Sequence, residues 1–356
     1  MHHGSSRYQT IALLAAVLCY FSACDQPEFE VAQGQKILMD TFVSVRIFLP
    51  GGQDKAPAEA AIADAWHEMA RLDTMLSSYR DDNEMARVNR AAHAGPAALS
   101  QELLAILKRS LELSGQTAGA FDVTVGELTH LWGFGRKPAM PASEQIAQAL
   151  SGVGFRFLQL DTIGSTIQFS RENTELDLGG IAKGAIIDAA FGILKDAGFD
   201  DFLIDAGGDL RMSASTLTAG KRNVWVTHPR KQGEFFARFE LDNGAVATTG
   251  DYERFFYEEG KKYHHIIDPA TGFPSHQAVS TTVIANDAMT ADALATAFFI
   301  LGPQKAIAIA EQIAGVEAMV VFENGQHLEA LATKNLAPKI QFLDTDAKDK
   351  NSDTEN

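Results

Sequence analysis

The chain has 356 residues, of which 46% are hydrophobic and 21% charged, with 29 Gly and 11 Pro. This length and composition allow a substantial hydrophobic core and exclude a collagenous, low-complexity or mainly disordered protein. The 46 acidic residues outnumber the 30 basic ones and give a formal charge of −16. Electrostatic repulsion therefore argues against nucleic acid as a partner.

The first 23 residues have the pattern of an export signal. An apolar run occupies residues 11–21, which is short for a membrane span but suits the apolar core of a signal peptide. The tetrapeptide F-S-A-C at 21–24 is similar to a bacterial lipobox, with Phe21 where Leu is usual. We therefore expect cleavage before Cys24 and lipidation of that residue. An ordinary signal peptide and a short buried helix are the alternatives.

A lipidated Cys24 would anchor the mature chain to a membrane through residues 24–34, which we expect to be a linker. Asp25 resembles the signal that retains such lipoproteins in the bacterial inner membrane, here on its periplasmic face. Cys19 and Cys24 are the only cysteines in the sequence. The body of the protein therefore has no disulfide framework, cysteine zinc site or catalytic thiol.

Hydrophobic periodicity from residue 35 onward predicts alternating strands and helices without a long linker. Asn243-Gly244 and Asn324-Gly325 are expected to be hairpin turns. This irregular order predicts an α+β fold, one compact body of mixed, hairpin-containing sheets packed with helices over 35–340, followed by a disordered acidic tail at 341–356. The predicted elements are a strand over 36–48, helices over 58–79 and from Ser100, a strand pair at 157–160 and 166–169, a helix over 181–197, a strand at 202–205 and a helix over 289–301.

The segment T-A-D-A-L-A-T-A at 290–297 carries one candidate metal site. On a helix, Asp292 and Thr296 project from the same face because they are four residues apart. A carboxylate and a hydroxyl are hard oxygen donors that suit Mg²⁺ or Ca²⁺. A helix cap for the Asp and core packing for the Thr are the structural alternatives.

A second segment, L-D-L-G-G-I-A-K-G-A at 176–185, indicates an anion site. It contains a strand end at Asp177, a Gly-Gly pair and a helix start with Lys183. Paired glycines let a ligand approach the backbone, while helix-start amides and a lysine favour an anion such as a phosphate. The alternative is a tight strand-to-helix turn with a solvated lysine.

Two further segments end in turns that carry polar side chains. These are D-A-G-G-D-L at 205–210 and H-H-I-I-D-P-A-T-G at 264–272. A histidine near the end of a strand is a candidate general base at neutral pH, or else a solvated surface residue. The motifs H-E-x-x-H, G-x-S-x-G and G-x-G-x-x-G are absent from the sequence. Zincin protease, α/β-hydrolase and Rossmann dehydrogenase interpretations thereby lose their main support.

Taken together, these segments resemble the ApbE-type FAD:protein FMN transferases, a family also known as thiamine-biosynthesis lipoproteins. The resemblance extends over residues 39–301 in the family's order. It is carried by M-D-T-F (39–42), L-S-S-Y-R-D-D-N-E (76–84), G-A-F-D-V-T-V-G (119–126), L-W-G-F-G (131–135), D-L-G-G-I-A-K-G (177–184), D-A-G-G-D-L (205–210), H-I-I-D-P-A-T-G (265–272) and A-D-A-L-A-T-A (291–297).

The resemblance implies a Mg²⁺-dependent transfer of FMN from FAD to a Thr or Ser hydroxyl of a target protein, with release of AMP. It implies metal ligation by Asp292 and Thr296, and by the backbone carbonyls of Gly180 and Ala295. His265 matches the histidine proposed as general base. FAD contacts carry over to Met39, Ser78, Tyr79, Arg80, Ala120, Asp177, Lys183 and Ile266.

The resemblance also implies the partners, which are FAD and acceptor domains of membrane redox subunits that carry the flavinylated Thr or Ser. Two other functions remain open at this point. One is a Mg²⁺-dependent FAD pyrophosphatase, in which water replaces the acceptor hydroxyl. The other is a periplasmic flavin-binding lipoprotein without turnover.

Overall fold

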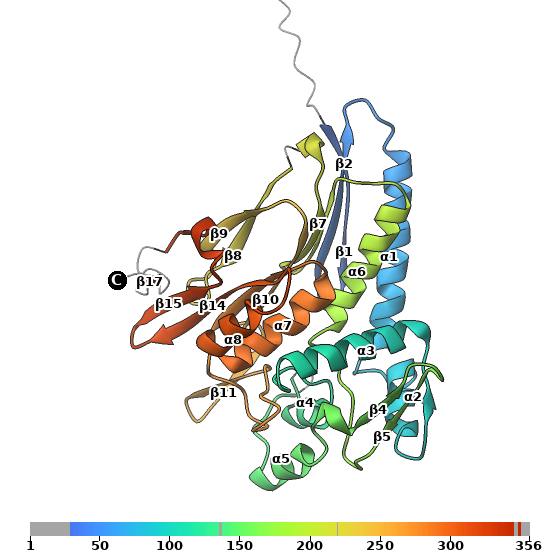
Figure 1. Ribbon diagram of the computed structural model, residues 1–356, viewed down its shortest axis with the longest axis vertical. Helices are drawn as coiled ribbons and strands as arrows, with labels where there is room; N and C mark the ends of the chain where they lie inside the picture. The colour runs from blue at the N-terminus through green and yellow to red at the C-terminus, as the bar shows by residue number, and fades with distance from the viewer. Residues whose placement is uncertain (1–28, 135–136, 219, 345–347, 350–356) are drawn as a thin grey trace, which may run out of the picture.

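A nine-stranded, almost entirely antiparallel sheet forms the centre of the protein (Figure 1). The computed structural model describes residues 29–134, 137–218, 220–344 and 348–349. Only the last pair of strands is parallel. Its strands, in spatial order, are β1 (Phe29–Leu38), β2 (Thr41–Pro50), β6 (Phe202–Ala206), β7 (Asp209–Ser213), β10 (Gly244–Gly250), β13 (Ser280–Ala285), β14 (Glu317–Asn324), β15 (His327–Ala332) and β17 (Lys348–Asp349).

Helices cover one face of this sheet. The helix α1 packs on α6, α6 on α7, and α7 on β10 and β13, while α8 lies against β14 (Figure 1). The helix α3 contacts α7 at the lower end of this layer. The bounds of these helices are α1 (Ala56–Leu76), α3 (Gln101–Gln116), α6 (Ala182–Asp196), α7 (Ala288–Leu301) and α8 (Pro303–Ala310).

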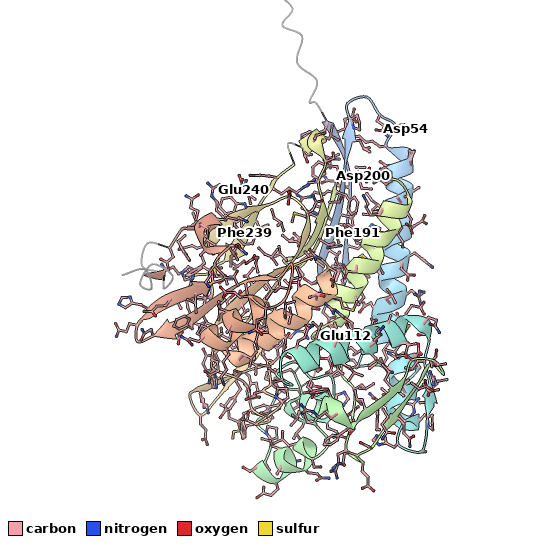
Figure 2. All side chains as sticks on the ribbon, viewed as in Figure 1. Asp54, Glu112, Phe191, Asp200, Phe239 and Glu240 are labelled. Carbon is pink, nitrogen blue, oxygen red and sulfur yellow. The ribbon has the colours of Figure 1, made fainter. Side chains whose placement is uncertain are left out.

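A second, three-stranded sheet covers part of the opposite face. Side chains alternate between the two faces of a strand, so in β14 Ala318 and Val320 belong to the helix-side core, while Met319 and Val321 belong to the other core. In Figure 2, Phe239 lies among the side chains of the second core. The second sheet consists of β16 (Gln341–Phe342), β9 (Phe235–Leu241) and β8 (Arg222–Thr227).

A smaller group of helices and strands lies below the sheet in Figure 1, and part of this group forms a separate apolar cluster around Trp132. Segments distant in sequence meet there, because Trp132 Nε1 donates a hydrogen bond to the Gly272 carbonyl at 2.8 Å. The remaining elements are α2 (Glu84–Ala91), β3 (Ala97–Ala98), α4 (Gly126–Trp132), α5 (Ser143–Leu150), β4 (Leu158–Asp161), β5 (Thr166–Phe169), β11 (Phe255–Glu258), β12 (Lys261–His264) and the 3₁₀ turns η1 (Phe155–Phe157), η2 (Thr216–Thr218) and η3 (Ala337–Lys339).

Most predicted elements are present, and the α+β prediction is confirmed. Ser100 accepts a hydrogen bond from the Leu103 N–H at 3.2 Å and caps α3, as its sequence predicts. Two predictions are wrong. The strand expected over 36–48 is a hairpin, because Met39 and Asp40 have φ of 53° and 58° and turn the chain between β1 and β2.

The second wrong prediction is the hairpin at Asn243-Gly244. The strands on either side of this turn, β9 and β10, belong to different sheets. Both edges of β10 are already paired, one with β7 and one with β13. The β14–β15 hairpin is confirmed, with Gly325 and Gln326 between the paired residues Asn324 and His327.

The folded body extends beyond the expected range of residues 35–340 at both ends. Residues 29–34, expected in the linker, are part of β1. In the expected disordered tail, residues 341–342 pair with β9 and 348–349 pair with β15. The signal sequence and Cys24 lie outside the described residues. Within the described ranges, no helix combines the length and apolarity needed to cross a membrane.

Candidate active site

The predicted anion-binding segment forms a tight loop before α6. Asp177 Oδ1 accepts a hydrogen bond from the Gly179 N–H at 2.7 Å, and Asp177 Oδ2 accepts one from Thr129 Oγ1 at 2.6 Å. The Asp177 carboxylate therefore stabilises the loop and joins it to α4. The loop delivers Lys183 to the first turn of α6.

The start of α6 contacts α7 without an intervening side chain at Gly184. A Cβ at this position would lie 2.3 Å from the Ala288 carbonyl oxygen, so the close approach requires glycine. The Gly184 N–H donates a hydrogen bond to Asp292 Oδ2 at 2.9 Å. The helix-start segment and the predicted metal-binding segment therefore meet directly.

Four charged side chains gather around this junction. Lys183 Nζ lies 2.7 Å from Asp209 Oδ2, and the Asp209 side chain is only 5% exposed. Burial lowers the pKa of Lys183, but Asp209 and Asp292 outweigh that effect and raise it above the ordinary lysine value. Burial raises the pKa of Asp292, Asp209 raises it further, and Lys183 opposes both. The charge of Glu253 raises the pKa of both Lys183 and Asp292. Three carboxylates therefore surround one ammonium group.

The predicted metal ligands lie together and have the donor chemistry of a hard cation. A Cβ built on Gly180 would lie 3.3 Å from Thr296 Oγ1, which places the Gly180 backbone beside that hydroxyl. Asp292, Ala295 and Thr296 follow one another on α7. The described part of the chain contains no group of three His, Cys, Asp or Glu side chains that could hold a metal. One buried carboxylate with a hydroxyl and backbone carbonyls fits Mg²⁺ rather than zinc.

His265 follows β12 and faces the turn before β11. Its backbone N–H donates to the Arg254 carbonyl at 3.1 Å, and its ring Nδ1 lies 3.3 Å from the same oxygen. A carbonyl oxygen only accepts, so Nδ1 carries the proton and Nε2 is left with a free lone pair. Burial, with Arg254 and His264 adding to it, lowers the pKa of His265 to about 4. The ring is therefore neutral at pH 7, as a general base requires.

The β1–β2 turn and the loop after α1 close the site on another side. Tyr79 Oη donates a hydrogen bond to the Phe134 carbonyl at 3.0 Å. Burial and Asp177 raise the pKa of Tyr79, while Arg254 lowers it, which places Tyr79 among these groups. Arg254 also lies 3.9 Å from Asp40 Oδ2, next to Met39. Met39 and Tyr79 therefore belong to the same region as Asp177.

Three of the other predicted FAD contacts, Ala120, Ile266 and Ser78, lie at the borders of this site. Ala120 precedes Phe121, whose ring a Cβ on Gly180 would approach to 3.4 Å. Ile266 is buried directly after His265. The Ser78 carbonyl lies 3.4 Å from His130 Nε2. Arg80 differs from the rest, because its exposed guanidinium pairs with Asp82 at 2.8 Å and 3.0 Å.

Three charged residues at the site were missing from the predicted set. Asp209 lies in the D-A-G-G-D-L segment, whose Gly-Gly pair and second carboxylate were the available signal. Glu253 and Arg254 belong to the turn between β10 and β11, which follows no recognised pattern. Their role depends on the pairing of β10, which brings this turn to the Lys183 end of the sheet.

Comparisons with known proteins place the chain in a family. The model of the ApbE family matches residues 39–320. The FAD:protein FMN transferase of Treponema pallidum is 31% identical, over 96% of this chain and 98% of that relative. The protein of the same name from Vibrio cholerae is also 31% identical, over 83% of this chain and 89% of its own.

Two solved structures share the fold. The crystal structure of the ApbE protein from Thermotoga maritima superimposes with a TM-score of 0.78 at 30% identity, covering 87% of this chain and 99% of that one. The flavin transferase ApbE from Vibrio cholerae gives 0.77 at 27% identity with the same coverage. On the family match and these relatives, the chain belongs to the ApbE family.

Proposed function

We propose that this chain is an FAD:protein FMN transferase, which moves FMN from FAD to a Thr or Ser hydroxyl of an acceptor protein. The names of its curated relatives support the flavin transfer. The observation that carries the proposal is that separate segments bring Lys183, Asp292 and His265 to one place. The Gly184 N–H beside Lys183 donates to Asp292, and, besides burial, Lys183 is close enough to His265 to lower the pKa of its ring. Together these three residues offer cationic charge for a diphosphate and a neutral base for a hydroxyl.

The proposed step is a substitution at the phosphorus that bears the riboflavin group. The acceptor hydroxyl oxygen attacks this phosphorus. The bond between the phosphorus and the bridging oxygen of the diphosphate then breaks. AMP leaves with that electron pair, and the hydroxyl proton passes to Nε2 of His265. The product is a phosphoester between FMN and the acceptor. No covalent enzyme intermediate is required, which agrees with the lack of a thiol in the body of the protein.

Charge neutralisation of the diphosphate is the second requirement of this step. Lys183 supplies one positive charge and is held in place by Asp209. Asp292, Thr296 and the carbonyls of Gly180 and Ala295 would hold Mg²⁺. When bound there, the cation neutralises charge that develops on the phosphate oxygens. Burial raises the pKa of Asp292, and a cation beside this carboxylate would favour its charged form.

An assay with FAD, Mg²⁺ and a Thr-containing acceptor domain tests the proposal. Flavin fluorescence that stays on the acceptor in a denaturing gel, together with AMP release, is the expected result. Free FMN and AMP without labelled acceptor would instead identify a pyrophosphatase. FAD that remains bound and unchanged would identify a flavin-binding protein.

We also propose that Cys24 carries a lipid and holds the protein at the periplasmic face of the bacterial inner membrane, near membrane redox subunits that serve as acceptors. The support is the lipobox-like F-S-A-C segment and the Asp after it. Metabolic labelling with an alkyne fatty acid tests this proposal. Label should appear in the wild type and be absent from Cys24→Ser. Equal labelling of both would refute it.

A further inference from the structure

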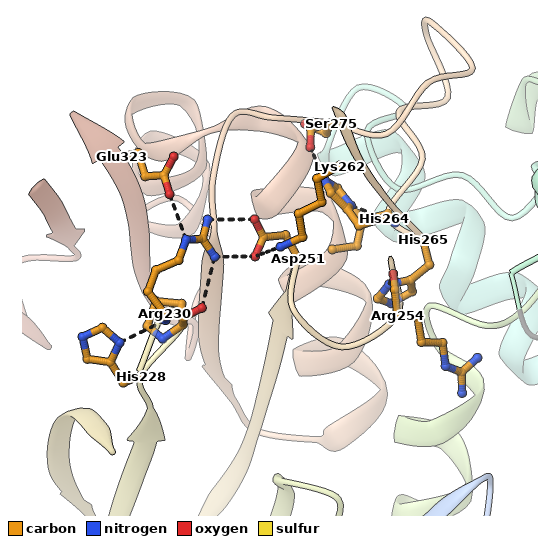
Figure 3. Close-up of polar contacts among 11 residues, drawn as sticks. His228, Arg230, Asp251, Arg254, Lys262, His264, His265, Ser275 and Glu323 are labelled. Carbon is orange, nitrogen blue, oxygen red and sulfur yellow. Dashed lines mark hydrogen bonds and ion pairs between the residues drawn. The ribbon is translucent and has the colours of Figure 1, made fainter. Parts of the chain in front are cut away.

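The four-residue turn at 251–254 joins β10 to β11 and supplies two groups to the site. Its first and last residues, Asp251 and Arg254, are labelled in Figure 3. The Arg254 carbonyl accepts from the His265 backbone and faces its ring Nδ1. The neighbouring Glu253 carboxylate acts on Lys183 and Asp292. A shift of this turn would therefore change both the orientation of the His265 ring and the charge around Lys183.

The turn is fixed at its first residue, Asp251. Asp251 Oδ1 and Oδ2 accept hydrogen bonds from Arg230 Nη1 and Nη2 at 2.7 Å and 2.9 Å. Lys262 Nζ lies 3.2 Å from Oδ1, and the Asp251 N–H donates to the Val279 carbonyl at 3.2 Å. The carboxylate is 10% exposed, so this two-point pair with arginine is largely shielded from water.

Two further contacts hold Arg230, one from β14 and one from its own segment (Figure 3). Its Nε donates to Glu323 Oε1 on β14 at 2.8 Å, and its backbone N–H donates to His228 Nδ1 at 3.0 Å. Arg230 follows β8 in the second sheet, whereas Asp251 follows β10 in the main sheet. The pair thus fastens the active-site turn to a part of the protein that does not belong to the site.

We propose that Asp251 and Arg230 are positioning residues for His265. This inference rests on the proposed function and gives the pair a specific role in it. The pair holds the Arg254 carbonyl where it fixes the proton on Nδ1 and leaves Nε2 free for the acceptor hydroxyl. A displacement of about 1 Å at a reacting group costs up to ~10²-fold in rate. Loss of the two-point pair should therefore affect catalysis more than FAD binding.

Nuclear magnetic resonance of ¹⁵N-histidine-labelled protein tests the positioning directly and needs neither FAD nor acceptor. Wild type should show His265 as the Nδ1-protonated tautomer, and Asp251→Asn should show a mixture of both tautomers. An unchanged single tautomer in Asp251→Asn would overturn the proposal. Because this result does not depend on turnover, it separates failure of the positioning from failure of the proposed activity.

Kinetics supply the second readout. In Asp251→Asn, kcat for flavinylation should fall ~10-fold or more, while the Kd for FAD stays within about threefold of wild type, since Asp251 touches none of the predicted FAD contacts. Arg230→Lys keeps the charge but not the two-point geometry and should lie between wild type and Arg230→Gln. Parallel loss of kcat and FAD binding would show a general structural role instead.

Asp201→Asn is the matched control. Asp201 is a buried carboxylate that pairs with Arg222 at the start of β8, so it also joins the second sheet to the main sheet. This variant should lower Tm as Asp251→Asn does, yet keep kcat within about twofold at 25 °C. If kcat fell as far as it does in Asp251→Asn, lower stability alone would explain the loss of activity, and the positioning role would be refuted.

Discussion

Lys183 Nζ lies 2.7 Å from Asp209 Oδ2, and this ion pair joins the first turn of α6 to the first residue of β7. The lysine is 29% exposed and the aspartate 5%. The exposed side of the lysine leaves it able to meet an anionic ligand, while the aspartate holds it from the buried side. The same contact therefore contributes to stability and leaves the lysine accessible to a ligand.

A double-mutant cycle on Lys183 and Asp209 should show strong coupling. Removing one partner of a buried pair leaves an uncompensated charge, which typically costs ~3–5 kcal/mol. We expect Lys183→Met to lie at the lower end of this range because the lysine is partly exposed. The double variant Lys183→Met with Asp209→Asn should be more stable than the sum of the single effects predicts. Urea unfolding of the four proteins measures the coupling, and additive losses would contradict it.

Gly184 and Gly180 should respond differently to alanine. A Cβ at Gly184 would lie 2.3 Å from the Ala288 carbonyl oxygen, which is backbone and cannot rotate away. At Gly180 the nearest atom is Thr296 Oγ1 at 3.3 Å, which needs only a small shift. We expect Gly184→Ala to lose ~1–3 kcal/mol or more by overpacking and Gly180→Ala to unfold near wild type. Equal midpoints in thermal unfolding would disprove the close approach of α6 and α7.

Replacement of His265, the proposed base, should slow transfer. Removal of a general base typically costs ~10²–10⁴-fold in rate, so His265→Ala should lower kcat by this amount and change FAD affinity little. The pKa of His265 is lowered to about 4, so the ring stays neutral above that value. Protonation of His265 should therefore cause a fall in kcat/KM only as the pH drops toward 4. Nuclear magnetic resonance of the ring follows the titration of His265 directly, and a midpoint near pH 6.5 would show that the ring titrates as in water.

His130 should make stability depend on pH in the alkaline range. A hydrogen bond to Glu175 raises the pKa of His130 to about 9, against an ordinary value of 6.5. The protonated ring is favoured in the folded state, so its stabilisation is complete below pH 6.5 and is lost as the pH rises through 9. Tm of the wild type should therefore fall more between pH 6 and 9.5 than Tm of His130→Gln. Parallel curves for the two proteins would refute this.

The parts of the site that could be predicted from sequence are those built by short-range chemistry. The Gly-Gly pair, the helix start at Lys183 and the four-residue spacing of Asp292 and Thr296 each follow from local geometry. The partner of Lys183 could not be deduced, because it depends on which strand lies beside which. Only the order β6-β7-β10 brings Asp209 to this end of the sheet.

Tertiary pairing also explains the errors in the predicted fold. Asn243-Gly244 has the sequence of a hairpin turn, yet β9 pairs with β8 and β16, since β7 and β13 already occupy both edges of β10. The Met39-Asp40 turn was missed because its sequence carries no turn signal. Neither residue is glycine, although both have positive φ. Such strained backbone is maintained only by its surroundings, here a hydrogen bond from the Met39 N–H to Asp73.

Asp292 gives the sharpest test of the metal site. Mg²⁺ that binds only the folded protein stabilises it, by ~2.7 kcal/mol at a hundredfold excess over Kd. Addition of Mg²⁺ should therefore raise Tm of the wild type. Asp292→Asn removes the negative charge but still offers an oxygen to the Gly184 N–H, so it should fold and yet lose both the Mg²⁺-dependent rise in Tm and Mg²⁺-dependent turnover. Asp200→Asn is the control, because Asp200 is an exposed carboxylate beyond the far end of α6 (Figure 2). If Asp292→Asn kept the wild-type response to Mg²⁺, the cation would bind elsewhere, and Asp292 would not be its ligand.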